Sequence, residues 1–235
     1  MRGPHSHRES TTCKRGLDIL LALAALLLTL PLQAALVLWV WLATGTPLLY
    51  RETRLGLNGR PFQICKLRTL VPGSSGDCSI AVDSDPRITM PGRALRRIRL
   101  DELPQLWLVL NGTMSIVGPR PLSPEHAAAV DAADLSRIHS RRPGCTGAAA
   151  LDFIADDEVL SEWGPNCVAC GLEQLYLKAV LPQKVAAELD YIENWSLALD
   201  FKLLARTIVT LFSGKRREAS RNRVEDILDS FTRIR

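Results

Sequence analysis

The sequence lacks any cysteine pattern typical of a disulfide scaffold or a zinc site. Its six cysteines follow no framework spacing, and Cys167-x-x-Cys170 has neither a second CxxC nor a nearby pair of histidines. The four histidines, at positions 5, 7, 126 and 139, form no metal-binding pattern either. Because no cleavable secretory signal is evident, we expect the cysteines to be the reduced thiols of a cytosolic protein.

A strong excess of one charge is also missing. Lysines and arginines number 29 against 25 acidic residues, a net charge of +4 that does not argue for a nucleic-acid partner. The arginines are instead concentrated in three stretches, 93–99, 137–142 and 215–223. Such clusters indicate contacts with phosphate groups or anionic lipid. At 235 residues the chain fits one domain, or one domain with an appendage.

Charged residues are absent altogether from Ile19 to Tyr50, a run of 32 residues. The run is too long for the apolar core of a secretory signal, which is roughly 7–15 residues. It also falls between the ~20 residues of one membrane span and the ~40 of two. Pro31 lies inside the run and is expected to interrupt or kink a helix there.

Both flanks of this run are basic, with Lys14 and Arg15 before it and two arginines after it. Basic flanks favour a segment that enters and leaves the membrane on the cytoplasmic side. We therefore expect residues 14–50 to form a re-entrant helix-break-helix with the break near Pro31, rather than a tilted single span. Asp18 is expected to pair with Lys14 or Arg15 across a helical turn, and residues 1–13 to form a disordered basic leader.

The remainder of the chain predicts a small, mainly helical α+β domain over residues 51–213. Asn58-Gly59 is a strong signal for a β-hairpin, and residues 71–84, rich in Gly and Ser, predict a mobile loop. Residues 93–99 predict a basic helix with Leu95 and Ile98 facing inward. Residues 201–212 form an amphipathic helix suited to the membrane interface or, nearly as well, to a core.

Residues 214–235 form a basic, amphipathic tail. Apolar residues recur in it at helical spacing, at positions 224, 227, 228, 231 and 234. The tail is expected either to lie on anionic lipid or to dock on another subunit, as in a homo-oligomer.

Two adjacent carboxylates, Asp101 and Glu102, follow the arginine-rich helix. Asp101 suits the N-cap of a helix whose apolar residues, beginning with Leu103, recur at helical spacing. At a helix N-terminus, backbone amides and the helix dipole keep a carboxylate ionised, as a nucleophile or a metal ligand must be. An isolated Asp-Glu pair is nevertheless more often a simple cap.

Arg120 stands between Pro119 and Pro121, which restrict its backbone and hold it in a fixed place. Beside two carboxylates, its guanidinium suits either a structural ion pair or a bidentate phosphate clamp. A second basic turn, with Arg142 before Pro143-Gly144, is a weaker phosphate signal.

These motifs, taken in order, resemble the bacterial sugar transferase family, the monotopic phosphoglycosyl transferases. The resemblance covers most of the chain, from about residue 14 to residue 212. The matching segments are Lys14-Arg15…Asp18, Lys66-Leu-Arg-Thr69, Asp85-Pro-Arg-Ile-Thr89, Leu100-Asp-Glu-Leu-Pro-Gln-Leu-Trp107, Gly112-Thr-Met-Ser-Ile-Val-Gly-Pro-Arg-Pro121, Arg142-Pro-Gly-Cys-Thr-Gly147 and Leu189-Asp-Tyr-Ile192…Ser196…Asp200. The chain departs from shorter family members after Gly147, where residues 148–158 replace a Trp-Ala-Gln segment.

The resemblance implies an enzyme that moves a phosphosugar from a nucleotide sugar, usually a UDP-sugar, to a membrane polyprenyl phosphate. Asp101 would attack the β-phosphorus, and Glu102 would help to hold Mg²⁺, or Mn²⁺, or position the nucleophile. The phosphate-binding residues would be Lys66, Arg68, Arg96, Arg120 and Arg142. The enzyme would start glycan assembly (exopolysaccharide, O-antigen, capsule or glycoprotein) at the bacterial inner membrane, with its catalytic domain on the cytoplasmic face.

A rival hypothesis from another class is a non-catalytic anchor or scaffold on the membrane surface. In that case the carboxylate pair is a cap and the arginines bind lipid headgroups. The ordered motifs favour the enzyme, because lipid binding does not need adjacent carboxylates.

Overall fold

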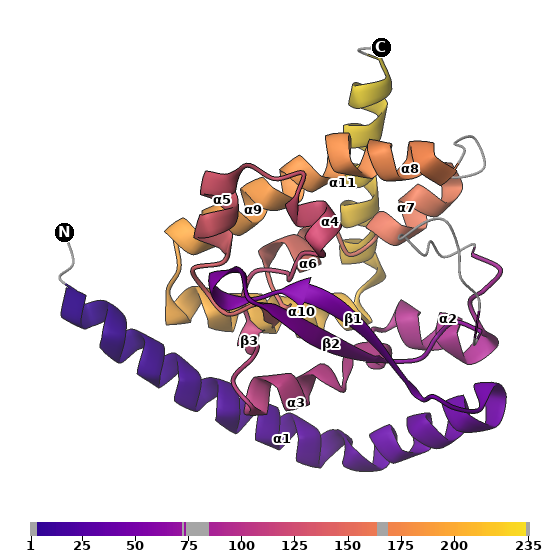
Figure 1. The fold of residues 1–235 in the computed structure, drawn as a ribbon, viewed down its shortest axis with the longest axis horizontal. Coiled ribbons are helices and arrows are strands. Elements are labelled where there is room, and N and C mark those ends of the chain that lie inside the picture. The colour runs from indigo at the N-terminus through magenta and orange to yellow at the C-terminus, as the bar shows by residue number, and fades with distance from the viewer. Residues whose placement is uncertain (1–3, 72, 74–84, 164–168, 234–235) are drawn as a thin grey trace.

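The computed structural model describes residues 4–71, 73, 85–163 and 169–233 (Figure 1). Most of the predicted loop at 71–84 and Cys167 of the CxxC pair lie outside these residues. In chain order the elements are α1 (Pro4–Thr44), β1 (Leu49–Leu55), η1 (Leu57–Gly59), β2 (Pro61–Leu67), α2 (Met90–Arg97), η2 (Leu100–Glu102), α3 (Gln105–Leu110), β3 (Ser115–Val117), α4 (Pro124–Ala127), α5 (Ala132–Ile138), β4 (Gly144–Thr146), α6 (Ala148–Asp152), α7 (Asp156–Trp163), α8 (Ala169–Leu175), the π-helical turn η4 (Tyr176–Val180), α9 (Leu181–Glu193), α10 (Leu197–Phe212) and α11 (Gly214–Arg233). The predicted class, mainly helical α+β, is confirmed.

Helix α1 continues through Pro31 without the predicted interruption. It bends along its length instead (Figure 1), as helices do at proline. The Thr29 hydroxyl donates to the Ala25 carbonyl at 2.6 Å and accepts from the Gln33 amide at 2.8 Å. A kink removes one backbone hydrogen bond, whereas a break would leave several backbone groups unpaired in an apolar run.

The same helix begins at Pro4, so residues 4–13 of the predicted leader are helical, while residues 1–3 lie outside the described residues. Once a helix is nucleated, each added residue gains one hydrogen bond, which favours extension into the preceding residues.

From Thr12 to Thr44, α1 is long and apolar enough to cross a membrane, with a mean hydropathy of 2.3 in an 18-residue window. Most of this stretch faces away from the rest of the protein. Its exposed large side chains include Leu20, Leu23, Leu27, Leu28, Leu30, Leu38, Trp41 and Leu42. An apolar surface of this extent is typical of a lipid-facing segment.

The polar residues at the start of the apolar run hold α1 against the domain, but not as predicted. Buried Asp18 accepts hydrogen bonds from the Ser115 hydroxyl and the Ile116 backbone N–H, at 2.9–3.0 Å. Lys14 pairs with Asp200 at 2.6 Å. Arg15 donates to the carbonyls of residues 109 and 110 at the end of α3. The predicted pairing of Asp18 with Lys14 or Arg15 is therefore wrong, because tertiary partners replace those one turn away.

The predicted hairpin is confirmed: β1 and β2 are antiparallel, with Arg51 opposite Cys65. Asn58 takes the left-handed conformation of the turn, with φ of 57°. Ile64 and Leu67 of β2 are buried, which fixes the neighbouring Lys66 in the wall of the domain. In Figure 1 the hairpin crosses the molecule between α3 and the C-terminal helices.

The second sheet pairs β3 and β4 in parallel, Ser115 with Gly144 and Val117 with Thr146. Its glycines permit a very close approach. A Cβ on Gly144 would lie 2.2 Å from the Gly118 nitrogen, and one on Gly147 would lie 2.2 Å from the Gly118 oxygen. The Gly-Pro-Arg-Pro turn is thus locked against the Pro-Gly-Cys-Thr-Gly turn, which fixes the backbone of Arg120.

The C-terminal tail packs on its own domain. Val224 and Leu228 of α11 are fully buried and belong to the main hydrophobic cluster, with residues of α7, η4 and α9. The helix was correctly predicted, but its packing partner was not. Helical spacing of apolar residues does not show whether they face lipid, another subunit or the core of the same chain. In α10, Phe201 and Ile208 are exposed while Leu203 is buried.

Candidate active site

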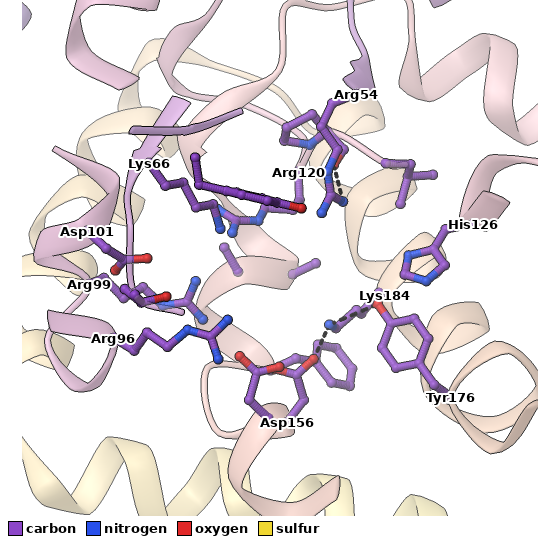
Figure 2. Close-up of a pocket in the computed structure, with 18 of the residues that line it drawn as sticks. Arg54, Lys66, Arg96, Arg99, Asp101, Arg120, His126, Asp156, Tyr176 and Lys184 are labelled. Atoms are coloured by element: carbon purple, nitrogen blue, oxygen red, sulfur yellow. Dashed lines mark hydrogen bonds and ion pairs between the residues drawn. The ribbon is translucent and has the colours of Figure 1, made fainter. Parts of the chain in front are cut away.

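A cavity of about 680 Å³ is lined by residues of α2, η2, β2, α7 and α9 among others, and Figure 2 shows many of its lining side chains. Charged and polar side chains line most of it. They are Arg54, Lys66, Arg68, Thr69, Arg87, Arg96, Arg99, Asp101, Arg120, His126, Asp156, Asp157, Tyr176, Lys184 and Glu188. Five of the predicted site residues therefore meet in one cavity: Lys66, Arg68, Arg96, Asp101 and Arg120.

Asp101 lies in a 3₁₀ turn, η2, and not at the N-cap of a helix as predicted. Helix α3 begins only at Gln105, after Pro104. The turn follows Arg99, whose backbone is left-handed with φ of 54°. This reversal ends α2 and brings Arg99 and Asp101 to the same side of the cavity. It also leaves Ile98 45% exposed rather than inward-facing, while Leu95 is buried as predicted.

Glu102, the second carboxylate, is held by three cations. Arg120 donates two hydrogen bonds to it, of 2.7 and 3.0 Å, in the bidentate arrangement. Lys66 adds a contact of 3.1 Å and Arg99 one of 3.4 Å. Burial opposes ionisation of this side chain, but Arg120 and Lys66 outweigh burial and hold the pKa of Glu102 well below its ordinary value. Glu102 is thus a fixed anion that orders the surrounding cations.

Asp101 has a different environment from its neighbour. Its side chain is buried, lines the cavity, and accepts no hydrogen bond from a residue that the structure describes. Burial, followed by the charge of Glu102, raises its pKa above the ordinary value, against the opposing effect of Lys66 and Arg99. The structure therefore provides one clamped carboxylate and one carboxylate whose oxygens are open to a ligand.

The basic side of the cavity contains donors without acceptors. The Arg54 Nε and Arg68 Nη1 atoms are buried and have no hydrogen-bond partner among the described residues. Buried donors are normally paired, so two orphaned guanidinium atoms on one wall indicate an anionic ligand. Arg142, also predicted to bind phosphate, lies outside the cavity. Its Nε donates to the Gly112 carbonyl at 2.8 Å, a structural contact that ties two turns together.

The opposite side of the cavity was not predicted. Lys184 pairs with Asp156 and lies 3.2 Å from the Tyr176 hydroxyl, and these residues face Asp101 and Arg99 across the cavity (Figure 2). His126 packs against Tyr176 with ring centroids 5.0 Å apart.

One sequence signal pointed to this wall. Lys184 and Glu188 are four residues apart, so they share a helix face with the apolar Leu181 and Val185. Charges on a buried apolar face indicate a site.

Glu188 is 4% exposed, and only one of its oxygens has a partner. Oε1 accepts from the Arg120 backbone N–H at 2.9 Å, whereas Oε2 is buried without a hydrogen bond from any described residue. Burial raises the pKa of Glu188 to about 7. The carboxyl thus titrates near neutral pH.

Replacing Glu188 with Gln should change how stability depends on pH. Glutamate has an ordinary pKa of 4.5, so the folded state prefers the neutral form and loses this preference as pH rises to about 7. Glu188→Gln is neutral throughout and should therefore be more stable than the parent by about 3 kcal/mol at pH 8, at ~1.4 kcal/mol per pKa unit. Thermal unfolding in detergent at about pH 5 and pH 8 measures this difference. An equal difference between the two proteins at both pH values would contradict it.

The residues present fit a divalent metal in one respect. Asp101 is an open carboxylate beside Glu102, and Mg²⁺ is typically held by one or two carboxylates together with substrate phosphates and water. The oxygens of Glu102 are already occupied by cations, so Asp101 is the better ligand of the two. The described residues contain no group of three or more metal-ligating side chains.

A family model described as "Bacterial sugar transferase" matches residues 9–214. The UDP-glucose:undecaprenyl-phosphate glucose-1-phosphate transferase of Caulobacter vibrioides is 39% identical over 207 residues, covering 85% of this chain and 70% of the relative. The UDP-N-acetylgalactosamine-undecaprenyl-phosphate N-acetylgalactosaminephosphotransferase of Aeromonas hydrophila is 32% identical over 209 residues, 86% of this chain and 44% of the relative. The exopolysaccharide production protein ExoY of Rhizobium meliloti is 32% identical over 213 residues, 83% of each.

Proposed function

The chain belongs to the bacterial sugar transferase family, and from this premise we propose that it transfers a sugar 1-phosphate from a UDP-sugar to undecaprenyl phosphate. This reaction would be the first membrane step in exopolysaccharide assembly. The similar proteins bear names that specify a UDP-sugar donor and an undecaprenyl phosphate acceptor. Because one name specifies glucose and another N-acetylgalactosamine, the sugar itself is left to experiment.

Asp101 is the proposed nucleophile. One of its carboxylate oxygens forms a bond to the β-phosphorus of the donor, and the bond from that phosphorus to the bridging oxygen breaks. The bridging oxygen and its electron pair leave with UMP. An oxygen of undecaprenyl phosphate then attacks the same phosphorus and releases the Asp101 carboxylate, giving the lipid diphosphate sugar. The observation that carries this assignment is that Asp101 is open to a ligand while Glu102 is clamped.

Attack by a carboxylate on a diphosphate brings like charges together. The cations around Glu102 reduce this repulsion: Arg120, Lys66 and Arg99 face the same cavity as Asp101. Because Glu102 holds them in place before substrate binds, little reorganisation is needed in the transition state. Two displacements at one nucleophile also predict ping-pong kinetics.

Mg²⁺, or Mn²⁺, is the proposed cofactor, with Asp101 and Glu102 as its candidate protein ligands. When bound, the metal would neutralise charge on the phosphate oxygens. Lys66 and Arg96 provide positive charge to the same cavity.

The lipid acceptor accounts for α1, whose exposed apolar surface would hold the catalytic domain, residues 51–213, at the inner membrane on its cytoplasmic face. We also propose that residues 14–50 are re-entrant, entering and leaving the membrane on the cytoplasmic side. Single cysteines introduced near residues 10 and 55 should then both react with a membrane-impermeant reagent from the cytoplasmic side only. Labelling from opposite sides would establish a span.

Transfer activity tests the proposed function directly. Membranes containing the protein are incubated with labelled UDP-sugars, undecaprenyl phosphate and Mg²⁺, with a parallel reaction in EDTA. At least one donor should give a lipid-linked product, and EDTA should abolish it. The absence of product across a broad donor panel would instead favour the non-catalytic membrane anchor.

A further inference from the structure

Unpaired polar atoms of two kinds, donors and acceptors, line the cavity. On the basic wall, Arg54 Nε and Arg68 Nη1 are donors without acceptors. Glu188 Oε2, on α9, and His126 Nε2, on α4 near Arg54, are also buried and without partners among the described residues. Leaving a buried polar group unpaired costs about 1–3 kcal/mol. Two complementary sets of orphaned groups therefore indicate a ligand that satisfies both.

The charges that line the cavity determine where the phosphates of such a ligand can bind and where its neutral part can bind. Asp156, Asp157 and Glu188 line the wall that α7 and α9 form, and the cation on that wall, Lys184, is already paired with Asp156, so the wall leaves little positive charge for a phosphate group. Burial and the charges of Arg54 and Lys184 lower the pKa of His126, so its ring is neutral and offers no positive charge to an anion. The wall that α7 and α9 form is suited to a neutral group that both donates and accepts hydrogen bonds, as a sugar hydroxyl does.

Contacts within the protein already hold the side chains of the wall that α7 and α9 form. Asp156 is 5% exposed and pairs with Lys184, which contacts the Tyr176 hydroxyl at 3.2 Å. The ring of Phe153 also lines the cavity, 5.9 Å from the Lys184 nitrogen. Figure 2 shows Lys184 and Tyr176 directed into the cavity from the side opposite Asp101. A few fixed polar groups beside aromatic rings are typical of a specific small-molecule site.

We propose that Glu188, Tyr176 and the Asp156–Lys184 pair form the subsite that binds the sugar hydroxyls of the donor and so determine which sugar is accepted. This inference rests on the proposed function. The diphosphate lies on the basic wall, and the sugar extends toward Glu188. A site built to hydrogen-bond a hydroxyl rejects an analogue that lacks it by up to roughly 10⁴–10⁵-fold, because its buried polar groups are then left unpaired.

The test uses the full-length protein in detergent with the donor that it accepts and a set of monodeoxy analogues of that donor. Glu188→Gln turns the free acceptor into a donor, and Tyr176→Phe removes one hydroxyl from the same wall. Each variant should lower kcat/KM for the parent donor by about 10-fold or more. For the one analogue that lacks the contacted hydroxyl, variant and unaltered protein should agree within about 2-fold.

Inhibition by UMP separates this role from a general loss of structure. UMP carries no sugar, so its inhibition constant should stay within about 2-fold in both variants. Glu218→Gln, an exposed change on α11, is the matched control and should leave kcat/KM for every donor unaltered.

Equal losses for all donors and analogues would overturn the subsite, since they would place Glu188 in the support of Arg120. Unaltered kinetics in both variants would overturn it as well. In either case the unaltered protein still transfers sugar, and the proposed function stands. No transfer by the unaltered protein would overturn the proposed function and the subsite together.

Discussion

Asp101→Asn should abolish transfer while leaving the protein folded and bound to membranes. The amide has the shape of the carboxylate but cannot attack phosphorus, and loss of a covalent nucleophile lowers kcat by roughly 10³-fold or more. Stability should change little or rise, because Asp101 accepts no hydrogen bond from a described residue and burial already disfavours its charge. Initial rates, membrane flotation and thermal unfolding measure the three properties.

Asp190→Asn is the matched control for this substitution. Asp190 is an exposed residue of α9 whose side chain contacts Asn194, and its loss should leave the rate within about 2-fold of the parent. If Asp101→Asn transfers sugar at the rate of the parent, Asp101 is not the nucleophile.

Arg120→Lys is expected to give the second large effect. Lysine keeps the positive charge but cannot make the two parallel hydrogen bonds to Glu102 that the guanidinium makes. We expect kcat/KM to fall by about 10²-fold, the range for loss of one preorganised electrostatic contact. The protein should still fold, because Lys66 and Arg99 continue to pair with Glu102.

The pH profile of Arg120→Lys distinguishes a positioning effect from simple damage. Burial favours the neutral form of Glu102, and Arg120 is the largest influence that opposes it. Weakening that influence should raise the pKa of Glu102 toward its ordinary value, so activity should begin to fall at a higher pH on the acid side. If the variant keeps the kcat/KM of the parent and loses activity at the same low pH as the parent, the two hydrogen bonds from Arg120 to Glu102 are not needed for activity.

Local signals predicted those parts of the site that are set by neighbouring residues. Asn58-Gly59 specified the hairpin that carries Lys66, and the two prolines around Arg120 indicated a fixed guanidinium. The helix start at Asp101 was wrong because Arg99 adopts a left-handed backbone that ends α2 and allows only a 3₁₀ turn before Pro104. The two carboxylates therefore differ through tertiary contacts rather than through a helix dipole.

Contacts distant in sequence could not be predicted in the same way. Lys14 and Asp200 are 186 positions apart, and their pairing depends on how α1 and α10 pack. Glu188 reaches the backbone of Arg120 only because the Gly118 and Gly144 turns lock together. The wall that contains Asp156, Lys184 and Glu188 could not be predicted. The sequence shows an acidic segment at 152–158 and, separately, Lys184 and Glu188 at helical spacing, but not that the two segments face the same cavity.

Mass spectrometry of the protein incubated with donor, Mg²⁺ and no lipid acceptor is the most direct test of whether Asp101 carries the phosphosugar. If Asp101 is the nucleophile, UMP should be released and one phosphosugar adduct should form, on the peptide that contains Asp101. Addition of undecaprenyl phosphate should discharge the adduct into lipid-linked product. An adduct on any other residue, or lipid-linked product formed with no adduct and no UMP release before acceptor is added, would contradict this role of Asp101.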